Sequence, residues 1–96
     1  MEKNKEQIPA GAVYQIEVED KVCYLKEPDR ATTEIVLGLV ANPYKEPQFL
    51  RAGEIVLLKC WVGGDMEIQK DEKYLLPAAQ RALNIVEVKQ AKLKKL

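Results

Sequence analysis

Five prolines divide this chain into segments and limit what each segment can form. Proline fixes its own backbone angle and donates no backbone hydrogen bond, so it tends to mark the ends of helices and strands. Pro28 follows a β-rich segment, Pro43 ends a helical pattern, and Pro47 stands where another helix can begin. The regular elements must therefore be short, and 96 residues of them fit one small domain.

The first ordered part of the sequence predicts a β-hairpin. Apolar and polar residues alternate over residues 14–18, which is the period of a strand with one face in water. A second β-rich segment follows at 22–25, after a polar turn in which Asp20 is expected to adopt the left-handed conformation. Residues 1–12 show neither period and are predicted to form a flexible tail, which leaves 13–96 as the domain.

The remaining segments predict helices. Asp29 can cap a helix over residues 30–41, and a second, more apolar helix is expected over residues 47–61. A third helical stretch begins near Asp71 and runs to the C-terminus, with a kink or restart expected at Pro77. The predicted fold class is α+β, with an N-terminal β-hairpin followed by three or four helices packed in one small domain.

Cysteine and glycine each have a structural and a functional interpretation here. Cys23 and Cys60 are far apart in the sequence and are predicted to be buried, reduced thiols rather than a disulfide or a reactive pair. Residues 63–65, Gly-Gly-Asp, lack the rest of a phosphate-binding loop. The simpler interpretation is a glycine with positive φ just after a helix end, with Trp61 beside it as a lid on the core.

The composition argues against catalysis. The chain contains no histidine and no serine, which removes the commonest general base and metal ligand and every seryl nucleophile. Carboxylate pairs such as Asp65 with Glu67, or Asp71 with Glu72, suit helix starts better than a catalytic cleft, and the calcium-loop ligand series is incomplete. We therefore predict no enzyme, no cofactor and no metal site.

The charge and hydropathy patterns exclude further classes of protein. Fifteen basic and fifteen acidic side chains give a formal net charge of zero, so no global field attracts nucleic acid. No apolar run approaches the roughly 20 residues of a membrane-spanning helix, and residues 1–7 do not begin a secretory signal. We expect a cytoplasmic protein with neither a nucleic-acid nor a membrane partner.

The C-terminal third contains a short heptad pattern that predicts a protein-binding surface. Spacings of three and four residues relate Leu76, Ala79, Leu83, Val86, Gln90 and Leu93. Such a seam can take up an amphipathic partner helix or a second copy of the chain. The five apolar members, Leu76, Ala79, Leu83, Val86 and Leu93, are the predicted partner-binding residues. The alternative is that this segment folds back on the core.

Two segments resemble small phage-encoded tail assembly chaperones. They are residues 21–30, Lys-Val-Cys-Tyr-Leu-Lys-Glu-Pro-Asp-Arg, and residues 61–65, Trp-Val-Gly-Gly-Asp. In that group a short β-segment ends in a Tyr-Leu-x-x-Pro-x-Arg type of sequence and is followed by helices, and the similarity covers roughly residues 13–95.

The resemblance implies a phage or prophage protein of the host cytoplasm that stays out of the virion. It would bind the tape-measure protein, tail-tube subunits or both, and keep the tape-measure helices soluble until the tube polymerises around them. The alternatives are a structural virion component, such as a head–tail connector or tail-completion protein, and another small protein-binding module.

Overall fold

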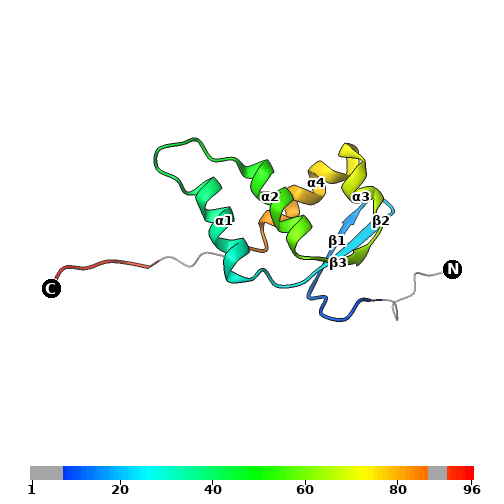
Figure 1. Ribbon diagram of the computed structural model, residues 1–96, viewed down its shortest axis with the longest axis horizontal. Coiled ribbons are helices and arrows are strands. Elements are labelled where there is room, and N and C mark those ends of the chain that lie inside the picture. Colours follow the sequence, from blue (N-terminus) through cyan, green and yellow to red (C-terminus); the bar gives the residue numbers. More distant parts are fainter. Residues whose placement is uncertain (1–7, 87–90) are drawn as a thin grey trace.

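The computed structural model describes residues 8–86 and 91–96 and confirms the α+β fold class. The strands are β1 (Tyr14–Val18), β2 (Lys21–Leu25) and β3 (Trp61–Gly64), and the helices are α1 (Arg30–Val40), α2 (Phe49–Lys59), α3 (Glu67–Lys70) and α4 (Glu72–Leu83). Figure 1 shows the sheet at one side of the molecule and α1 at the other, with α2 and α4 between them.

The predicted hairpin is present as the antiparallel pair β1 and β2, in which Ile16 lies opposite Cys23. The turn differs from the prediction, because Glu19, and not Asp20, adopts the positive φ of 58°. A tight connection between two antiparallel strands favours positive φ at its first central residue, since that backbone twist matches the twist of the strands. Glu19 occupies this position between Val18 and Lys21.

A third strand replaces the expected end of the second helix. Helix α2 stops at Lys59, and β3 pairs antiparallel with β2 in a sheet of order β1-β2-β3. Gly64 has the predicted positive φ, 130°, but within a strand, where a Cβ would lie 2.4 Å from the Cα of Cys23. Because only glycine permits this approach, Gly64 lets β3 run against β2.

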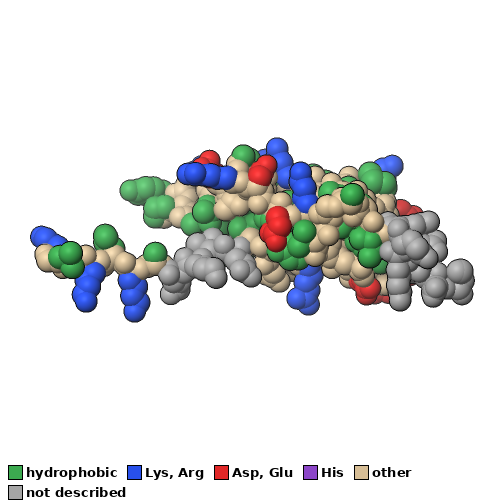
Figure 2. Space-filling model, turned by 90° about the horizontal axis from the view of Figure 1, so that it is seen from below, with side chains coloured by type: hydrophobic (Ala, Val, Ile, Leu, Met, Phe, Trp, Pro, Cys, Tyr) green, Lys and Arg blue, Asp and Glu red, His purple; other side chains and the backbone are tan. Residues whose placement is uncertain are grey.

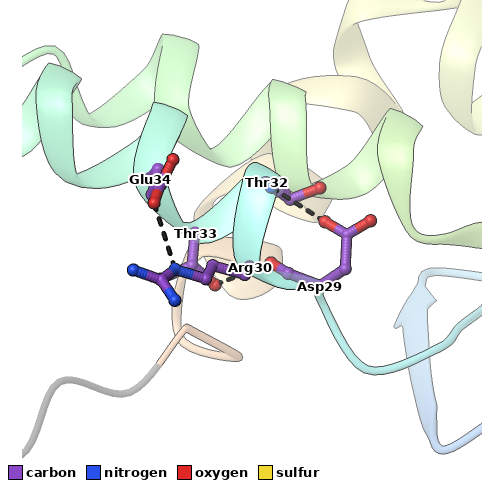
Figure 3. Close-up of polar contacts among 5 residues, drawn as sticks. All are labelled: Asp29, Arg30, Thr32, Thr33 and Glu34. Carbon is purple, nitrogen blue, oxygen red and sulfur yellow. Dashed lines mark hydrogen bonds and ion pairs between the residues drawn. The ribbon is translucent and has the colours of Figure 1, made fainter.

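Side-chain caps begin two of the helices, and the cap at Asp29 was predicted. The Asp29 carboxylate accepts a hydrogen bond of 2.8 Å from the backbone N–H of Thr32, and the Thr33 hydroxyl donates to the Asp29 carbonyl, as Figure 3 shows. Asp71 likewise accepts from the Lys73 N–H at the start of α4. The predicted restart at Pro77 does not occur, because α4 continues through this residue as one helix.

The core lies where α2 crosses α4 against one face of the sheet. Helix α2 supplies four buried residues, Ala52, Gly53, Val56 and Leu57. The largest fully buried side chains are Leu25, Leu57, Ile68, Val36, Val56, Cys23 and Cys60. Trp61 and Tyr74 are partly buried and pack against this cluster, as a lid on the core would.

The two ends of the chain differ in how they meet the domain. Residues 1–7 lie outside the described part, whereas Pro9 lies against Gly63 of β3 and accepts a hydrogen bond from the Ala12 N–H. The prediction that the last helix runs to the C-terminus is wrong, because α4 ends at Leu83. The β-branched residues that follow Asn84 have low helix propensity.

Candidate functional site

The five predicted partner-binding residues do not form one continuous surface. Ala79 is fully buried, Leu83 and Val86 are half-buried against the core, Leu76 is 40% exposed, and Leu93 is fully exposed beyond the end of α4. Gln90, the polar member of the same pattern, lies outside the described residues. The α4 residues at this heptad spacing therefore lie mainly on the face of the helix that packs against α2 and the sheet.

Large apolar side chains remain partly exposed on three helices. Ile35 on α1 is 42% exposed, Phe49 and Leu58 on α2 are 58% and 53% exposed, and Leu76 on α4 is 40% exposed. Single exposed apolar residues are ordinary on protein surfaces. Phe49 and Leu58 are nine residues apart on α2, about two and a half turns, so they lie on opposite sides of that helix.

Strand β1 is an edge strand beside an open groove. Among the described strands β1 pairs with β2 alone, which places it at the edge of the sheet. The groove next to it has a volume of about 540 Å³. Strand β1 and the C-terminal end of α4 line it through Tyr14, Gln15, Ile16, Glu17, Arg81, Asn84 and Ile85. An edge strand beside a groove is the arrangement that accepts an added strand.

A smaller hollow of about 200 Å³ flanks the same strand. It is formed by Ile8, Ala12, Val13, Tyr14, Gln15 and Tyr24. Tyr14 and Gln15 line both hollows, so β1 runs between them. This strand contains neither proline nor lysine, two residues that commonly protect exposed edges from pairing, and its one charged residue is Glu17.

Acidic side chains dominate the exposed part of the hairpin. Glu17, Glu19 and Asp20 are all exposed, and Gln15 donates a hydrogen bond of 2.8 Å to the Glu17 carboxylate. The nearest lysine in sequence, Lys21, pairs instead with Glu67 of α3 at 2.5 Å. That hydrogen bond raises the pKa of Lys21 above its usual value. The positive charge of Lys21 is therefore paired with Glu67 and not with a carboxylate of β1.

The Gly-Gly-Asp sequence has a structural role in strand pairing. The Asp65 carboxylate accepts a hydrogen bond of 2.9 Å from the Val22 N–H, and the Asp65 N–H donates one of 2.8 Å to the Val22 carbonyl. These two hydrogen bonds connect the residue after β3 to the start of β2. Two of the other three carboxylates considered for catalysis also have structural contacts, since Glu67 pairs with Lys21 and Asp71 caps α4.

The two cysteines are buried and free, as predicted. Burial raises the pKa of the Cys23 thiol to about 11, and the nearby Asp65 carboxylate adds to the shift. Burial also raises the pKa of Cys60. Since a thiol reacts as its thiolate, both groups are inert at neutral pH.

Over residues 8–86 and 91–96, no group of three or more histidine, cysteine or acidic side chains is placed to hold a metal ion. No helix in this part of the chain combines the length and apolar character needed to cross a membrane. No protein-family model, no curated protein and no solved structure matches the chain.

Proposed function

We propose that this protein is a phage or prophage tail assembly chaperone, a cytoplasmic helper without enzymatic activity. It binds the tape-measure protein, tail-tube subunits or both during tail morphogenesis. The observation that carries the proposal is the position of the two segments that resemble this family. Residues 21–25 form β2 and residues 61–64 form β3, and these strands are paired although 35 residues separate them in the sequence.

This pairing supports the proposal because it makes the two short resemblances one structural unit. Tyr24 lies opposite Gly63, and Cys23 lies opposite Gly64. Asp65, the last residue of the second segment, is bonded to Val22 of the first. If the two short matches were coincidental, there would be no reason to expect the two segments to lie side by side.

A chaperone of this kind needs apolar surface rather than catalytic groups. Partly exposed apolar side chains are present on three helices, at Ile35 on α1, Phe49 and Leu58 on α2, and Leu76 on α4. Covering the exposed half of one such side chain contributes about 1 kcal/mol, from roughly 25 cal/mol per Å² of apolar area. Several such contacts support reversible binding of an amphipathic helix, which must be released when the tail tube assembles.

Affinity capture from a producing host tests the proposal. The tagged chain is expressed during phage infection or prophage induction, captured proteins are identified by mass spectrometry, and purified particles are probed for the chain. Recovery of the long, helix-rich tape-measure protein, with the chain absent from particles, is the expected result. Stoichiometric presence in particles would instead indicate a structural virion component, and capture without tape-measure or tube proteins would contradict the chaperone role.

A matched pair of variants locates the binding surface. Phe49→Asp places a charge on the helical surface and should reduce the captured tape-measure protein at least about tenfold, the equivalent of 1.4 kcal/mol. Tyr44→Asp makes a comparable change in the loop between α1 and α2, where Tyr44 is 92% exposed, and should leave capture unchanged. Equal capture by both variants would show that α2 is not the binding surface.

A further inference from the structure

The described C-terminal segment, residues 91–96, is basic and exposed along its whole length. Its sequence is Ala-Lys-Leu-Lys-Lys-Leu, and each of the six residues is exposed. Leu93 and Leu96 are completely open to solvent. Figure 2 shows the lysine and apolar side chains of this segment standing clear of the body of the molecule. The described residues of the domain therefore cover neither its charges nor its leucines.

The charge of the chain is unevenly distributed along the sequence. Fifteen basic and fifteen acidic side chains give the net charge of zero. Three of the basic ones, Lys92, Lys94 and Lys95, lie in the last six residues, which contain no acidic side chain. Residues 1–90 are left with twelve basic and fifteen acidic side chains. A short positive segment thus follows a longer part of the chain with the opposite net charge.

The three lysines of this segment are not neutralised by the described carboxylates. The ion pairs among the described residues join Lys21 to Glu67 and Arg30 to Glu34. Exposed positive charges without a counter-charge attract an anionic partner, and salt weakens this attraction by screening. The segment therefore has the charge to bind an anionic surface.

The two leucines distinguish among anionic partners. Nucleic-acid phosphates would pair with the lysines but leave Leu93 and Leu96 in water, and the segment has no aromatic or arginine side chain to stack on a base. A bilayer with anionic lipids offers phosphate headgroups to the lysines and an apolar layer just beneath them to the leucines. Lysine suits this boundary because its apolar stem can be buried while its ammonium group stays in water.

We infer that residues 91–96 bind the surface of a membrane that contains anionic lipids. The lysines lie among the headgroups, and Leu93 and Leu96 enter the boundary of the acyl chains. The expectation of no membrane partner rested on the overall charge and on the lack of a spanning segment, and attachment at a surface requires neither. This binding is separate from the proposed chaperone role and uses none of the helical residues considered for it.

Flotation with lipid vesicles tests this inference. The purified chain is mixed with vesicles of phosphatidylcholine alone, or of equal parts phosphatidylcholine and phosphatidylglycerol, and the floated fraction gives a partition coefficient. The chain should bind only the anionic vesicles at low salt. Most of this binding should be lost at about 1 M salt, where the screening length falls to roughly 3 Å. Equal binding to both kinds of vesicle, or binding to neither, would overturn the inference.

A matched pair of double variants tests the lysines. Lys92→Gln with Lys94→Gln should lower the partition coefficient about 25-fold, because each lysine near an anionic surface contributes roughly fivefold. Lys45→Gln with Lys70→Gln removes the same charge from two exposed positions on the domain and should change binding little. Equal losses in the two variants would show that overall charge, and not this segment, governs binding, and would overturn the inference.

A third double variant tests the leucines at constant charge. Leu93→Ser with Leu96→Ser should lower the partition coefficient at least about fivefold, because less apolar area leaves water. Undiminished vesicle binding by this variant, or wild-type binding to a DNA duplex as strong as to vesicles at equal phosphate concentration, would show recognition of phosphate alone and overturn the membrane assignment. A chain ending at Gln90 should keep its circular dichroism spectrum and lose vesicle binding, and binding that survives the truncation would overturn the inference as well.

Discussion

Gly53 of α2 lies directly against the backbone of Ala79 in α4. A Cβ on Gly53 would fall 2.1 Å from the Ala79 carbonyl oxygen and 2.8 Å from its carbonyl carbon. The helices cross at these two residues, and the missing side chain allows their backbones to approach. Gly53→Ala should therefore lower the free energy of unfolding by about 2 kcal/mol, because overpacking against a rigid backbone outweighs the gain in helix propensity. Urea denaturation measures this change.

Gly38→Ala is the matched control for that substitution. Gly38 also lies within a helix, α1, but a Cβ there would meet nothing within 4 Å. The same chemical change should raise stability by about 0.5–1 kcal/mol through helix propensity and reduced freedom of the unfolded chain. Equal effects at both glycines would contradict the close α2–α4 crossing.

The cap of α1 should make stability depend on pH. The backbone N–H of Thr32, which donates to the carboxylate, lowers the pKa of Asp29 below its usual 3.8, with a smaller contribution from the Thr32 side chain. The folded chain thus favours the ionised form. This stabilisation is complete above pH 3.8 and is lost as the pH falls through the lower folded-state pKa.

Two substitutions at Asp29 separate the effect of the capping hydrogen bond on stability from the effect of ionising the carboxylate. Asp29→Ala should reduce stability at neutral pH and have a smaller effect in acid. Asp29→Asn keeps a side-chain acceptor but cannot ionise, so its stability should vary less with pH than that of the wild type over the acid range. Urea midpoints at neutral and acidic pH give both comparisons, and parallel pH dependence in all three proteins would exclude a role for this carboxylate.

The buried thiols should be protected from alkylation. Cys23 has a pKa of about 11 and Cys60 a raised pKa, both through burial, so neither thiol is ionised in the native protein at pH 8. Iodoacetamide at that pH should modify well under one thiol per chain in the time needed to modify both in 6 M guanidinium chloride. Rapid labelling of one native thiol would show that its side chain is accessible.

Replacing Leu76 or Ala79 of α4 with aspartate should lower the stability of the protein by different amounts. Ala79→Asp buries a carboxylate at the α2–α4 crossing and should cost at least about 3 kcal/mol, enough to unfold a marginally stable domain. Leu76→Asp acts at a side chain that is 40% exposed and should cost about 1 kcal/mol or less. Thermal melts followed by circular dichroism distinguish the two, and similar melting temperatures would contradict the orientation of α4.

The prediction of the hairpin, the Asp29 cap and the fold class from sequence succeeded because each depends on local signals. Alternation over residues 14–18 and the position of Asp29 before a helical stripe are read directly from neighbouring residues. The third strand could not be predicted in this way, because Trp61–Gly64 continues the apolar run of α2 and its partner β2 is distant in sequence. The β-prone Trp61-Val62 pair before two glycines is the signal that could have identified it.

The candidate site shows a different limit of sequence reasoning. A heptad pattern identifies one face of a helix but not whether the protein's own core or a partner covers it, and Ala79 is covered by Gly53. The edge position of β1 depends on strand order, which no local pattern encodes. The groove beside it requires the end of α4 to return to the hairpin, which is a property of the packed domain.

The most direct test of the chaperone role is the solubility of the tape-measure protein. That protein is expressed alone, with this chain, and with the Phe49→Asp variant, and its soluble fraction is measured after centrifugation. The proposed function predicts that the wild-type chain raises the soluble fraction several-fold and that the variant does so much less. A tape-measure protein whose solubility is the same in all three cultures would contradict it.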